Sequence, residues 1–461
     1  TLNASNLVLK SDADGTATFI AEGTANISNV AANQYLSASR NWYVSSPVTG
    51  AAIPGSGYSV YAYDETGGHA SDPAGPYWFT PTGNFTKGMG YIAFPTSAGA
   101  TLQFSGTLNT GTVDVDLTHS GATKTGFNLI GNPYPCHLSW TYDFVNANSS
   151  LIESSIWVRT NGGTTNNSVQ WSYATYNASS SESVPLVGNN GIIAPMQAFW
   201  VRAKAVGTLT LNSNLTKSHQ SSNPLKVRAA NNTERQRVRL QVSNGTATDE
   251  TLVYFDANAQ NGYDSYDSQK MSNNSATAPE IYSVTNGQKL VMNGLNFIEN
   301  DMEIPLGFST AQAGTFSIKA TQLTNLSIDT KVYLKDNTQI NALTELLPDQ
   351  EYTFTSNITT DNTSRFSLAF KAPINTTENN FIENELVRAY SNANGQILIE
   401  RNVKAENAVA YIYNSVGQLI QQLPLNEIIT GTGISYHSGT YFVSIRDNIK
   451  LTTIKVLVTS N

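Results

Sequence analysis

Short runs of β-branched and aromatic residues alternate with turn residues along almost the whole chain. The clearest runs span 238–242, 251–255, 352–354 and 366–370, and each lies between clusters of Gly, Asn, Asp or Pro. Alternation with a period of two is typical of strands with one buried face, whereas the helical period is nearly absent. The pattern therefore predicts an all-β protein built from serial β-sandwich domains.

The N-terminal region, residues 1–220, contains an internal resemblance. Two pairs of motifs carry it: 42–47 (WYVSSP) with 128–133 (NLIGNP), and 87–94 (KGMGYIAF) with 194–201 (APMQAFWV). We predict two related β-units, roughly 30–117 and 122–217, with loops inserted in the second. The alternative is a chance similarity between strands that end in turns.

Two polar segments predict domain boundaries. Residues 221–232 contain a proline among polar residues, and residues 375–384 are rich in Asn, Thr and Glu. Between them we expect a jelly-roll-like β-sandwich over 234–372. After them, residues 385–461 show short strands and Gly turns, which predict a small Ig-like sandwich of seven strands.

Composition narrows the class of protein. Charged residues make up 13% of the chain, about half the usual share, and the net charge is -8. The three arginines of 235–239 alternate along one strand, and we interpret them as a solvated face. No basic footprint for nucleic acid is present. No apolar run is long enough to span a bilayer.

The single cysteine, Cys136, excludes an internal disulfide. A bacterial surface protein of this size does not need one. No signal peptide precedes Thr1, so we expect a processed or truncated piece whose export signal lies upstream.

The C-terminal residues resemble a known sorting domain. Three ordered motifs carry the resemblance: 410–418 (AYIYNSVGQ), 438–443 (SGTYFV) and Lys455-Val456. They are similar to the C-terminal sorting domain of proteins exported by the type IX secretion system of Bacteroidetes. Asn414 to Gly417 reads as a hairpin turn between two strands.

The rest of the chain is similar to the non-catalytic C-terminal regions of such exported proteins. The matching segments are 7–17, 40–48, 126–135, 264–270, 304–308, 333–336 and Arg365-Phe366. The resemblance implies the type IX export machinery as a partner, translocation across the outer membrane, and an extracellular or outer-membrane surface location. It names no activity, and it implies that a catalytic domain could lie upstream of Thr1.

No motif for catalysis stands out. Cys136 precedes His137, but adjacent residues of an extended strand point to opposite faces, so we expect no cysteine protease there. The other histidines lack metal-ligand spacing, and no Gly-x-Ser-x-Gly or phosphate-binding loop is present. A weaker alternative is a hydrolase in the first domain, with carboxylates drawn from Glu65, Asp72, Asp143 and Glu153.

Two acidic stretches are candidates for calcium, the only cofactor we consider. Asp12 and Asp14 form an Asp-x-Asp-Gly turn, and Asp256, Asp264 and Asp267 crowd a second stretch. Calcium prefers six to eight oxygen ligands, which clustered carboxylates and carbonyls supply. The alternative, which we prefer, is that these side chains close their own turns.

Four aromatic residues are candidates for a ligand site. Tyr77 and Trp78 lie in a Pro/Gly loop, and Trp171 and Tyr173 follow a Thr/Asn-rich loop. Exposed rings can stack on the apolar faces of sugars. The alternative is that they pack in the cores of thin sandwiches.

These observations favour a secreted or cell-surface, non-enzymatic β-protein with a structural or adhesive role and a C-terminal export domain. The runner-up is a glycan-binding accessory region of a larger surface hydrolase. In either case the partner on the outer side would be a host or environmental glycan or protein.

Overall fold

The computed structural model describes most of the chain in two compact units, Thr1–Ala372 (the first unit) and Pro373–Asn461 (the terminal unit). The described residues are 2–4, 6–21, 25–121, 126–161, 171–186, 190–211, 215, 217–219, 235–273, 275–299, 301–327, 330–339, 343–348, 350–371, 387–392, 394–401, 408–446 and 451–459. The predicted linkers at 221–232 and 375–384 lie outside them.

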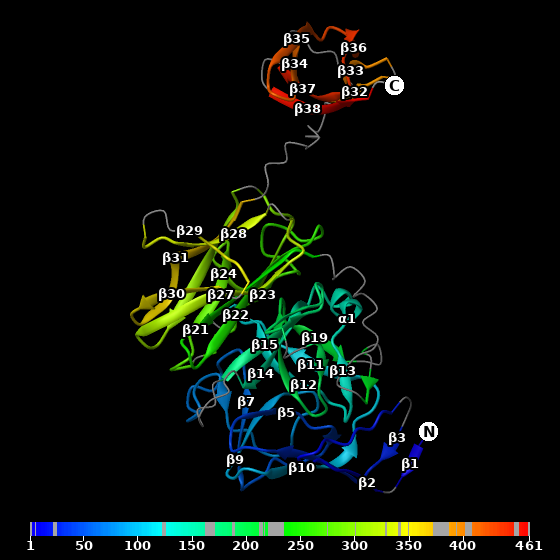
Figure 1. Ribbon diagram of the computed structural model, residues 1–461. Helices are drawn as coiled ribbons and strands as arrows, with labels where there is room; N and C mark the ends of the chain where they lie inside the picture. Colours follow the sequence, from blue (N-terminus) through cyan, green and yellow to red (C-terminus); the bar gives the residue numbers. More distant parts are fainter. Residues whose placement is uncertain are drawn as a thin grey trace. The chain divides into compact units, whose positions relative to one another are not determined.

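The prediction of an all-β protein is confirmed. Strands occur throughout both units (Figure 1), and one short helix, α1 (Tyr142–Ala147), is the single α-helix of the described residues. Thr141 begins that helix, because its hydroxyl accepts the backbone N–H of Phe144. Within the same described ranges, no helix is long and apolar enough to cross a membrane.

The first part of the first unit forms one four-stranded sheet in the order β5-β9-β7-β8 and another in the order β2-β4-β10-β6. β1 pairs with β3 in a parallel ribbon. The bounds of these strands are β1 (Leu2–Ala4), β2 (Leu7–Leu9), β3 (Ala25–Ile27), β4 (Val30–Leu36), β5 (Trp42–Val44), β6 (Val48–Thr49), β7 (Tyr58–Tyr63), β8 (Trp78–Phe79), β9 (Tyr91–Pro95) and β10 (Ala100–Leu108).

The next part forms a five-stranded sheet in the order β12-β18-β14-β15-β16, with β11 paired to β19 and β17-β13-β20 as a small third sheet. The bounds are β11 (Val113–Leu117), β12 (Phe127–Gly131), β13 (His137–Ser139), β14 (Ile152–Asn161), β15 (Trp171–Asn177), β16 (Glu182–Val184), β17 (Ile192–Ile193), β18 (Ala198–Ala203), β19 (Gly207–Leu211) and β20 (Lys217–Ser218).

These two parts share the topology of six strands each. In both sheets the first of four strands along the chain pairs with the fourth, the fourth with the second, and the second with the third. The orders are β5-β9-β7-β8 in one sheet and β12-β18-β14-β15 in the other. In addition, β4 pairs antiparallel with β10, just as β11 pairs with β19. The motifs that resemble each other in sequence therefore occupy matching strands: β5 with β12, and β9 with β18.

The two parts also contact each other through the same motifs. The backbone N–H of Ser45 donates to the carbonyl of Met196 at 2.8 Å, and that of Gly131 donates to the carbonyl of Gly88 at 2.9 Å. The first motif of each part therefore bonds the second motif of the other part: 42–47 bonds 194–201, and 128–133 bonds 87–94. Such reciprocal contacts are what a pseudo-twofold relation between two copies produces.

Residues 235–371 form a continuous hydrogen-bonded sheet of eleven described strands, in the order β29-β28-β31-β26-β24-β25-β22-β21-β27-β30 with β23 paired to β25. Residues from distant strands, such as Val238, Phe316 and Leu368, share one core, so the sheet folds over on itself. The bounds are β21 (Arg237–Ser243), β22 (Thr248–Phe255), β23 (Ser268–Gln269), β24 (Glu280–Thr285), β25 (Gln288–Leu295), β26 (Glu303–Thr310), β27 (Gly314–Thr324), β28 (Lys331–Asp336), β29 (Leu343–Glu345), β30 (Glu351–Ser356) and β31 (Thr359–Lys371).

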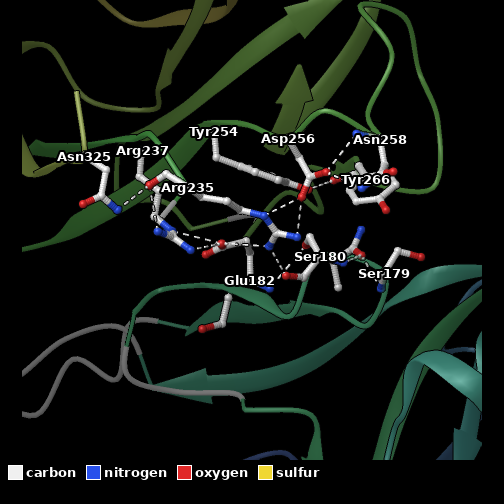
Figure 2. Close-up of polar contacts among 12 residues, drawn as sticks. Ser179, Ser180, Glu182, Arg235, Arg237, Tyr254, Asp256, Asn258, Tyr266 and Asn325 are labelled. Carbon is white, nitrogen blue, oxygen red and sulfur yellow. Dashed lines mark hydrogen bonds and ion pairs between the residues drawn. The ribbon is translucent and has the colours of Figure 1, made fainter. Parts of the chain in front are cut away.

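A buried polar junction joins β16 to this sheet (Figure 2). Glu182 Oε1 lies 2.7 Å from Arg237 Nη2 and 3.3 Å from Arg235 Nη1. Arg235 also pairs with Asp256 and donates to the carbonyl of Ser180. The interpretation of 235–239 as a solvated strand face is therefore wrong: Arg237 and Arg239 are buried, because β16 and the residues before it cover that face and supply acceptors.

A second set of contacts lies beside the junction. Asn177 Nδ2 donates to the carbonyl of Asp267 at 2.9 Å, and the hydroxyls of Ser155 and Ser268 lie 2.6 Å apart. Val184 packs on Leu252. Buried, hydrogen-bonded polar groups fix relative orientation, so the N-terminal region and the eleven-stranded sheet belong to one compact unit.

The terminal unit is a sandwich of seven described strands in two antiparallel sheets, ordered β32-β33-β36 and β35-β34-β37-β38. Its core contains side chains from both sheets, among them Ile397, Ile399, Ile412 and Val443. The bounds are β32 (Val387–Ser391), β33 (Gln396–Arg401), β34 (Val409–Asn414), β35 (Leu419–Pro424), β36 (Ile429–Ser435), β37 (Gly439–Arg446) and β38 (Leu451–Val458).

Candidate functional site

A cleft of about 370 Å³ opens in the N-terminal region where its two parts meet. The end of β7 and the segment before β9 form one side, and β11 and β12 form the other. Its lining combines apolar and aromatic side chains with charged and hydroxyl groups. The lining residues are Tyr63, Asp64, Glu65, His69, Phe79, Thr86, Lys87, Met89, Asp114, Val115, Asp116, Thr118, Asn128, Leu129 and Ile130. We call this the Tyr63 cleft.

One side of the Tyr63 cleft is aromatic. The rings of His69 and Phe79 stack with centroids 4.0 Å apart and planes 13° apart. His69 Nε2 lies 3.2 Å from Asp64 Oδ2, which orients the imidazole. Burial raises the pKa of Asp64, but hydrogen bonds from Thr66 and the charge of His69 outweigh it and lower that pKa below the usual range. The wall therefore combines flat ring surface with a fixed carboxylate.

The opposite side carries two carboxylates on β11. Asp114 and Asp116 are two residues apart, so both point to the same exposed face of the strand. Asp114 accepts the hydroxyl of Thr210 at 2.6 Å and Asp116 that of Thr208 at 2.8 Å, both from β19. These contacts hold the carboxylates in place and leave further oxygen lone pairs open to the cleft.

Glu65 lies in the same lining but has a structural role. Its carboxylate is 1% exposed and accepts the backbone N–H groups of Ser120 and Gly126 and the hydroxyl of Ser120 at 2.7–3.0 Å. Burial raises its pKa, but these donors together lower it below the ordinary value. A carboxylate held ionised in this way is a poor general acid.

Of the other three carboxylates of the hydrolase alternative, Asp72 and Glu153 have hydrogen-bond or ion-pair partners. Asp72 accepts the backbone N–H of Thr80 and of Ala74, which lowers its pKa. Asp143 lies in the first turn of α1. Glu153 pairs with Arg202 at 2.8 Å, and burial raises its pKa. Of the four carboxylates of that alternative, only Glu65 lines the Tyr63 cleft.

Three of the four predicted ligand aromatics gather beside the cleft. The ring of Trp78 contacts that of Tyr63 edge-to-face, with ring centroids 5.1 Å apart, and the ring of Tyr77 stacks on Tyr63 with centroids 6.4 Å apart. Tyr173 packs against the same hydrophobic cluster as Tyr63 and Trp78. These rings are half-buried, so packing and ligand contact are both open to them. The side chain of Trp171 lies outside the described residues.

The residues predicted for calcium close turns with their own oxygens. Asp12 Oδ1 accepts the backbone N–H of Asp14 at 3.0 Å and of Gly15 at 3.2 Å. Asp256 Oδ1 accepts from Asn258 at 2.9 Å, while its other oxygen pairs with Arg235. These are the turn-closing bonds that the alternative interpretation expects.

Asp264 and Asp267 are engaged in the same way. Asp264 accepts the backbone N–H groups of Gln260 and Tyr266, and Asp267 accepts those of Asp264 and Gly294, at 2.7–2.9 Å. Across the described ranges, no group of three or more His, Cys, Asp or Glu side chains is arranged to hold a metal ion. The calcium hypothesis remains a prediction.

Cys136 is buried, and burial raises the pKa of its thiol to about 11. The pKa of His137 is lowered, also by burial first. A thiol with a raised pKa carries little thiolate at neutral pH and is a poor nucleophile.

Among the residues that line the cleft, sequence reasoning missed Asp114, Asp116 and Lys87. A signal for the first two was present. The run Val113 to Leu117 alternates apolar and acidic residues, which places both carboxylates on one exposed strand face. The position of that face beside β7 depends on the tertiary fold.

The comparisons with known proteins give a family and little else. A search of curated proteins found no match. A solved structure of a biofilm-associated protein, BSP domain, is 9% identical over 92% of this chain and 96% of that chain, with a TM-score of 0.14, which establishes no common fold. A domain family of unknown function, DUF8693, matches residues 3–370, nearly the whole first unit. The chain therefore belongs to the DUF8693 family.

Proposed function

We propose that this chain is a non-catalytic, adhesive cell-surface protein that binds carbohydrate in the Tyr63 cleft. The observation that carries the proposal is the pairing of ring surface with fixed carboxylates in one cavity of about 370 Å³. Sugars present apolar faces that stack on rings, and vicinal hydroxyls that donate to carboxylates. The cleft offers the first through Phe79 and Tyr63, and the second through Asp114 and Asp116.

The arrangement of carboxylates supports binding without hydrolysis. Glycosidases pair an ionised carboxylate with one whose pKa is raised, so that it can donate a proton. In the Tyr63 cleft, Asp64 and Glu65 both have lowered pKa values, and Glu65 is occupied by Ser120 and Gly126. These two carboxylates therefore suit a permanent acceptor role better than proton transfer.

Glycan binding is tested on the full chain with a glycan array, followed by calorimetry on any hit. The informative variant is the double substitution Asp114→Ala and Asp116→Ala, because both side chains are exposed. The matched control is Glu345→Ala with Glu351→Ala, which likewise removes two carboxylates. These two lie outside the cleft, where each pairs with a lysine. We expect saturable binding that the first variant weakens by about tenfold or more and the control leaves unchanged. Absence of binding on the array, or equal binding by both variants, contradicts the proposal.

For the terminal unit we propose the sorting role that its motifs imply. The supporting features are the three ordered motifs and the seven-stranded antiparallel sandwich that contains them, with Asn414 to Gly417 in the hairpin turn between β34 and β35. The test is expression, in a bacterium with type IX secretion, of the gene with and without the codons for 387–461. Surface exposure of the longer product alone supports the role, and equal exposure of both contradicts it.

A further inference from the structure

A second cleft, of about 410 Å³, lies in the eleven-stranded sheet. The neighbouring strands β24, β25 and β26 contribute residues to it, as do the segment that follows β23 and the start of β31. Ile281 of β24 packs into the core of the sheet, so its neighbours Glu280 and Tyr282 lie on the other face, where they line this cleft. We call it the Asn273 cleft.

An irregularity in strand pairing shapes one side of the Asn273 cleft. The register of β31 against β26 shifts twice over residues 306–310. In the matching stretch of β31, Asp361 has a φ of +54°, a conformation that few residues other than glycine adopt. Its carboxylate accepts the hydroxyl of Tyr282 at 2.8 Å and pairs with Lys289 Nζ at 2.5 Å. Irregularities of this kind re-aim side chains and are common next to active sites.

The buried amide of Asn273 carries the inference. The residue lines the cleft and is 4% exposed. Its Oδ1 accepts the backbone N–H of Ser275 at 3.0 Å. Its Nδ2 has no hydrogen-bond partner in the part of the chain that the structure describes. Buried polar groups of native proteins are almost always hydrogen-bonded, so this amide indicates an acceptor that comes from outside the chain.

The hydrogen-bonding capacity that remains open in the cleft is mostly that of donors. Glu280 Oε1 already accepts the hydroxyl of Ser272 at 2.8 Å and the backbone N–H of Asn273 at 2.6 Å. Both oxygens of Asp361 are engaged as well. The ammonium group of Lys289, by contrast, has three N–H donors and directs one to Asp361. The cleft therefore suits a ligand that brings acceptors.

The charges around the cleft favour a neutral ligand. Its two lysines are each paired with an aspartate, Lys289 with Asp361 and Lys270 with Asp249. Glu280 meets neutral donors in its described contacts. Two ammonium groups against three carboxylates leave one negative charge, in a chain whose net charge is -8. An anion is repelled here, and a cation brings further donors to acceptors that are already occupied.

We propose that the Asn273 cleft binds a neutral N-acylated sugar, an N-acetylhexosamine unit, whose amide carbonyl accepts from Asn273 Nδ2. The hydroxyl oxygens of the sugar supply acceptors for Lys289. The apolar residues of the lining, Ala278, Ala311 and Ile358, offer contacts for the methyl group of the acetyl substituent. This inference does not depend on the Tyr63 cleft, whose lining shares no residue with this one.

A peptide is the other common source of neutral amide carbonyls, and the strands beneath the cleft disfavour it. Extended peptides gain affinity by adding a strand to a free sheet edge. Here β24 lies between β25 and β26, β25 lies between β24 and β22, and β26 lies between β24 and β31. The cleft therefore offers side-chain donors on a sheet face and no strand edge at its floor.

Isothermal titration calorimetry on the full chain tests the proposal. The probe is triacetylchitotriose, and the matched ligand is cellotriose, a neutral sugar of the same length with a hydroxyl in place of each acetamido group. We expect saturable binding of triacetylchitotriose and an affinity for cellotriose at least about tenfold lower, because cellotriose lacks the carbonyl that meets the buried donor.

Two variants remove the proposed donors one at a time. Asn273→Asp keeps the Oδ1 acceptor for Ser275 and replaces the N–H donor with an oxygen. Lys289→Met removes the ammonium group, and its control, Lys319→Met, removes a lysine that pairs with Glu351 outside the cleft. We expect each of the first two variants to weaken the binding of triacetylchitotriose by about tenfold, and the control to leave it unchanged.

Four results overturn the proposal: no binding of triacetylchitotriose, equal binding of cellotriose, equal binding of an N-acetylated trialanine amide, or binding that Lys289→Met and Lys319→Met affect alike. Far-ultraviolet circular dichroism establishes that Asn273→Asp is folded. If it is not, Lys289→Met carries the comparison, because that side chain is 44% exposed and its replacement opens no cavity.

The double variant Asp114→Ala with Asp116→Ala separates this site from the Tyr63 cleft. Unchanged binding of triacetylchitotriose by this variant supports a site in the Asn273 cleft. If the double variant abolishes that binding while Asn273→Asp and Lys289→Met leave it intact, the sugar occupies the Tyr63 cleft. The present inference then fails and the proposed function stands.

Discussion

Ser45 and Gly131, which occupy the same place in the two related motifs, face each other where the two parts of the N-terminal region meet. A Cβ atom at Gly131 would lie 2.2 Å from Ser45 Cβ and 2.1 Å from Ser45 Oγ. Contact between counterparts is expected close to a pseudo-twofold axis. The closeness explains why the second motif has a glycine where the first has a serine, since one of the two positions has room for no side chain.

Gly131→Ala should therefore destabilise the first unit, by about 1–3 kcal/mol or more, because the new methyl group overlaps Ser45 and the carbonyl of Met89. All six tryptophans lie in residues 1–220, so their fluorescence in urea reports this region without the terminal unit. Gly314→Ala is the control, since nothing lies within 4 Å of a Cβ there. Equal urea midpoints for the two variants would show that the contact between Gly131 and Ser45 tolerates the added methyl group.

The ion pair between Glu182 and Arg237 should contribute strongly to the junction. Both side chains are at most 9% exposed, and removing one partner leaves a buried charge without compensation. We expect Glu182→Ala to lower the free energy of unfolding by about 3–5 kcal/mol. Glu345→Ala is the comparison, because its pair with Lys331 is exposed and should be worth less than about 1 kcal/mol. A cost below that of the exposed pair would contradict a stabilising role for the junction.

Local pattern predicted the strands well and the junction poorly. The runs at 238–242 and 251–255 lie within β21 and β22, because alternation records which strand face is buried. The same alternation placed three arginines on one face but could not show what covers it. Arg237 meets Glu182 across 55 residues of sequence, and nothing in its neighbours records that partner.

The candidate site was partly predictable for the same reason. The amphipathic character of Trp78 and Tyr173 marks them as interface residues, and the fold places both in one aromatic cluster. Their approach requires the pairing of β7 with β8 and of β14 with β15, together with the contact of the two sheets. No spacing in the sequence encodes that distance.

Cys136 should be unreactive in the folded protein. Its thiol is 1% exposed, and burial raises its pKa to about 11, so thiolate is scarce at neutral pH. We expect negligible reaction with a thiol reagent such as Ellman's reagent under native conditions, and one thiol per chain in denaturant. Rapid native labelling would show instead that this segment opens or that the thiol is accessible.

The pH dependence of stability should carry a contribution from Asp267. Burial, with help from the nearby carboxylates of Asp264 and Glu153, raises the pKa of Asp267 to about 7, although the N–H groups of Asp264 and Gly294 act in the opposite direction. In the unfolded chain the value is about 3.9. The folded state therefore holds a proton that the unfolded state releases between these two values.

The sign of the effect follows from proton linkage. The contribution of Asp267 is fully present below about pH 4 and is lost as the pH rises through about 7, at a slope of at most about 1.4 kcal/mol per pH unit. The side chain of Asp267→Asn cannot ionise, so the stability of this variant should lack the decline. At every pH the substitution should also lower the free energy of unfolding by about 1–3 kcal/mol, because an amide is a poorer acceptor for the N–H groups of Asp264 and Gly294. The melting temperature of the unmodified chain should then exceed that of the variant by more at about pH 5 than at about pH 8. Asp301→Asn, at an exposed site, serves as the control. If the melting temperature of the unmodified chain exceeded that of Asp267→Asn by more at the higher pH, Asp267 would be ionised in the folded protein and would stabilise it as an anion.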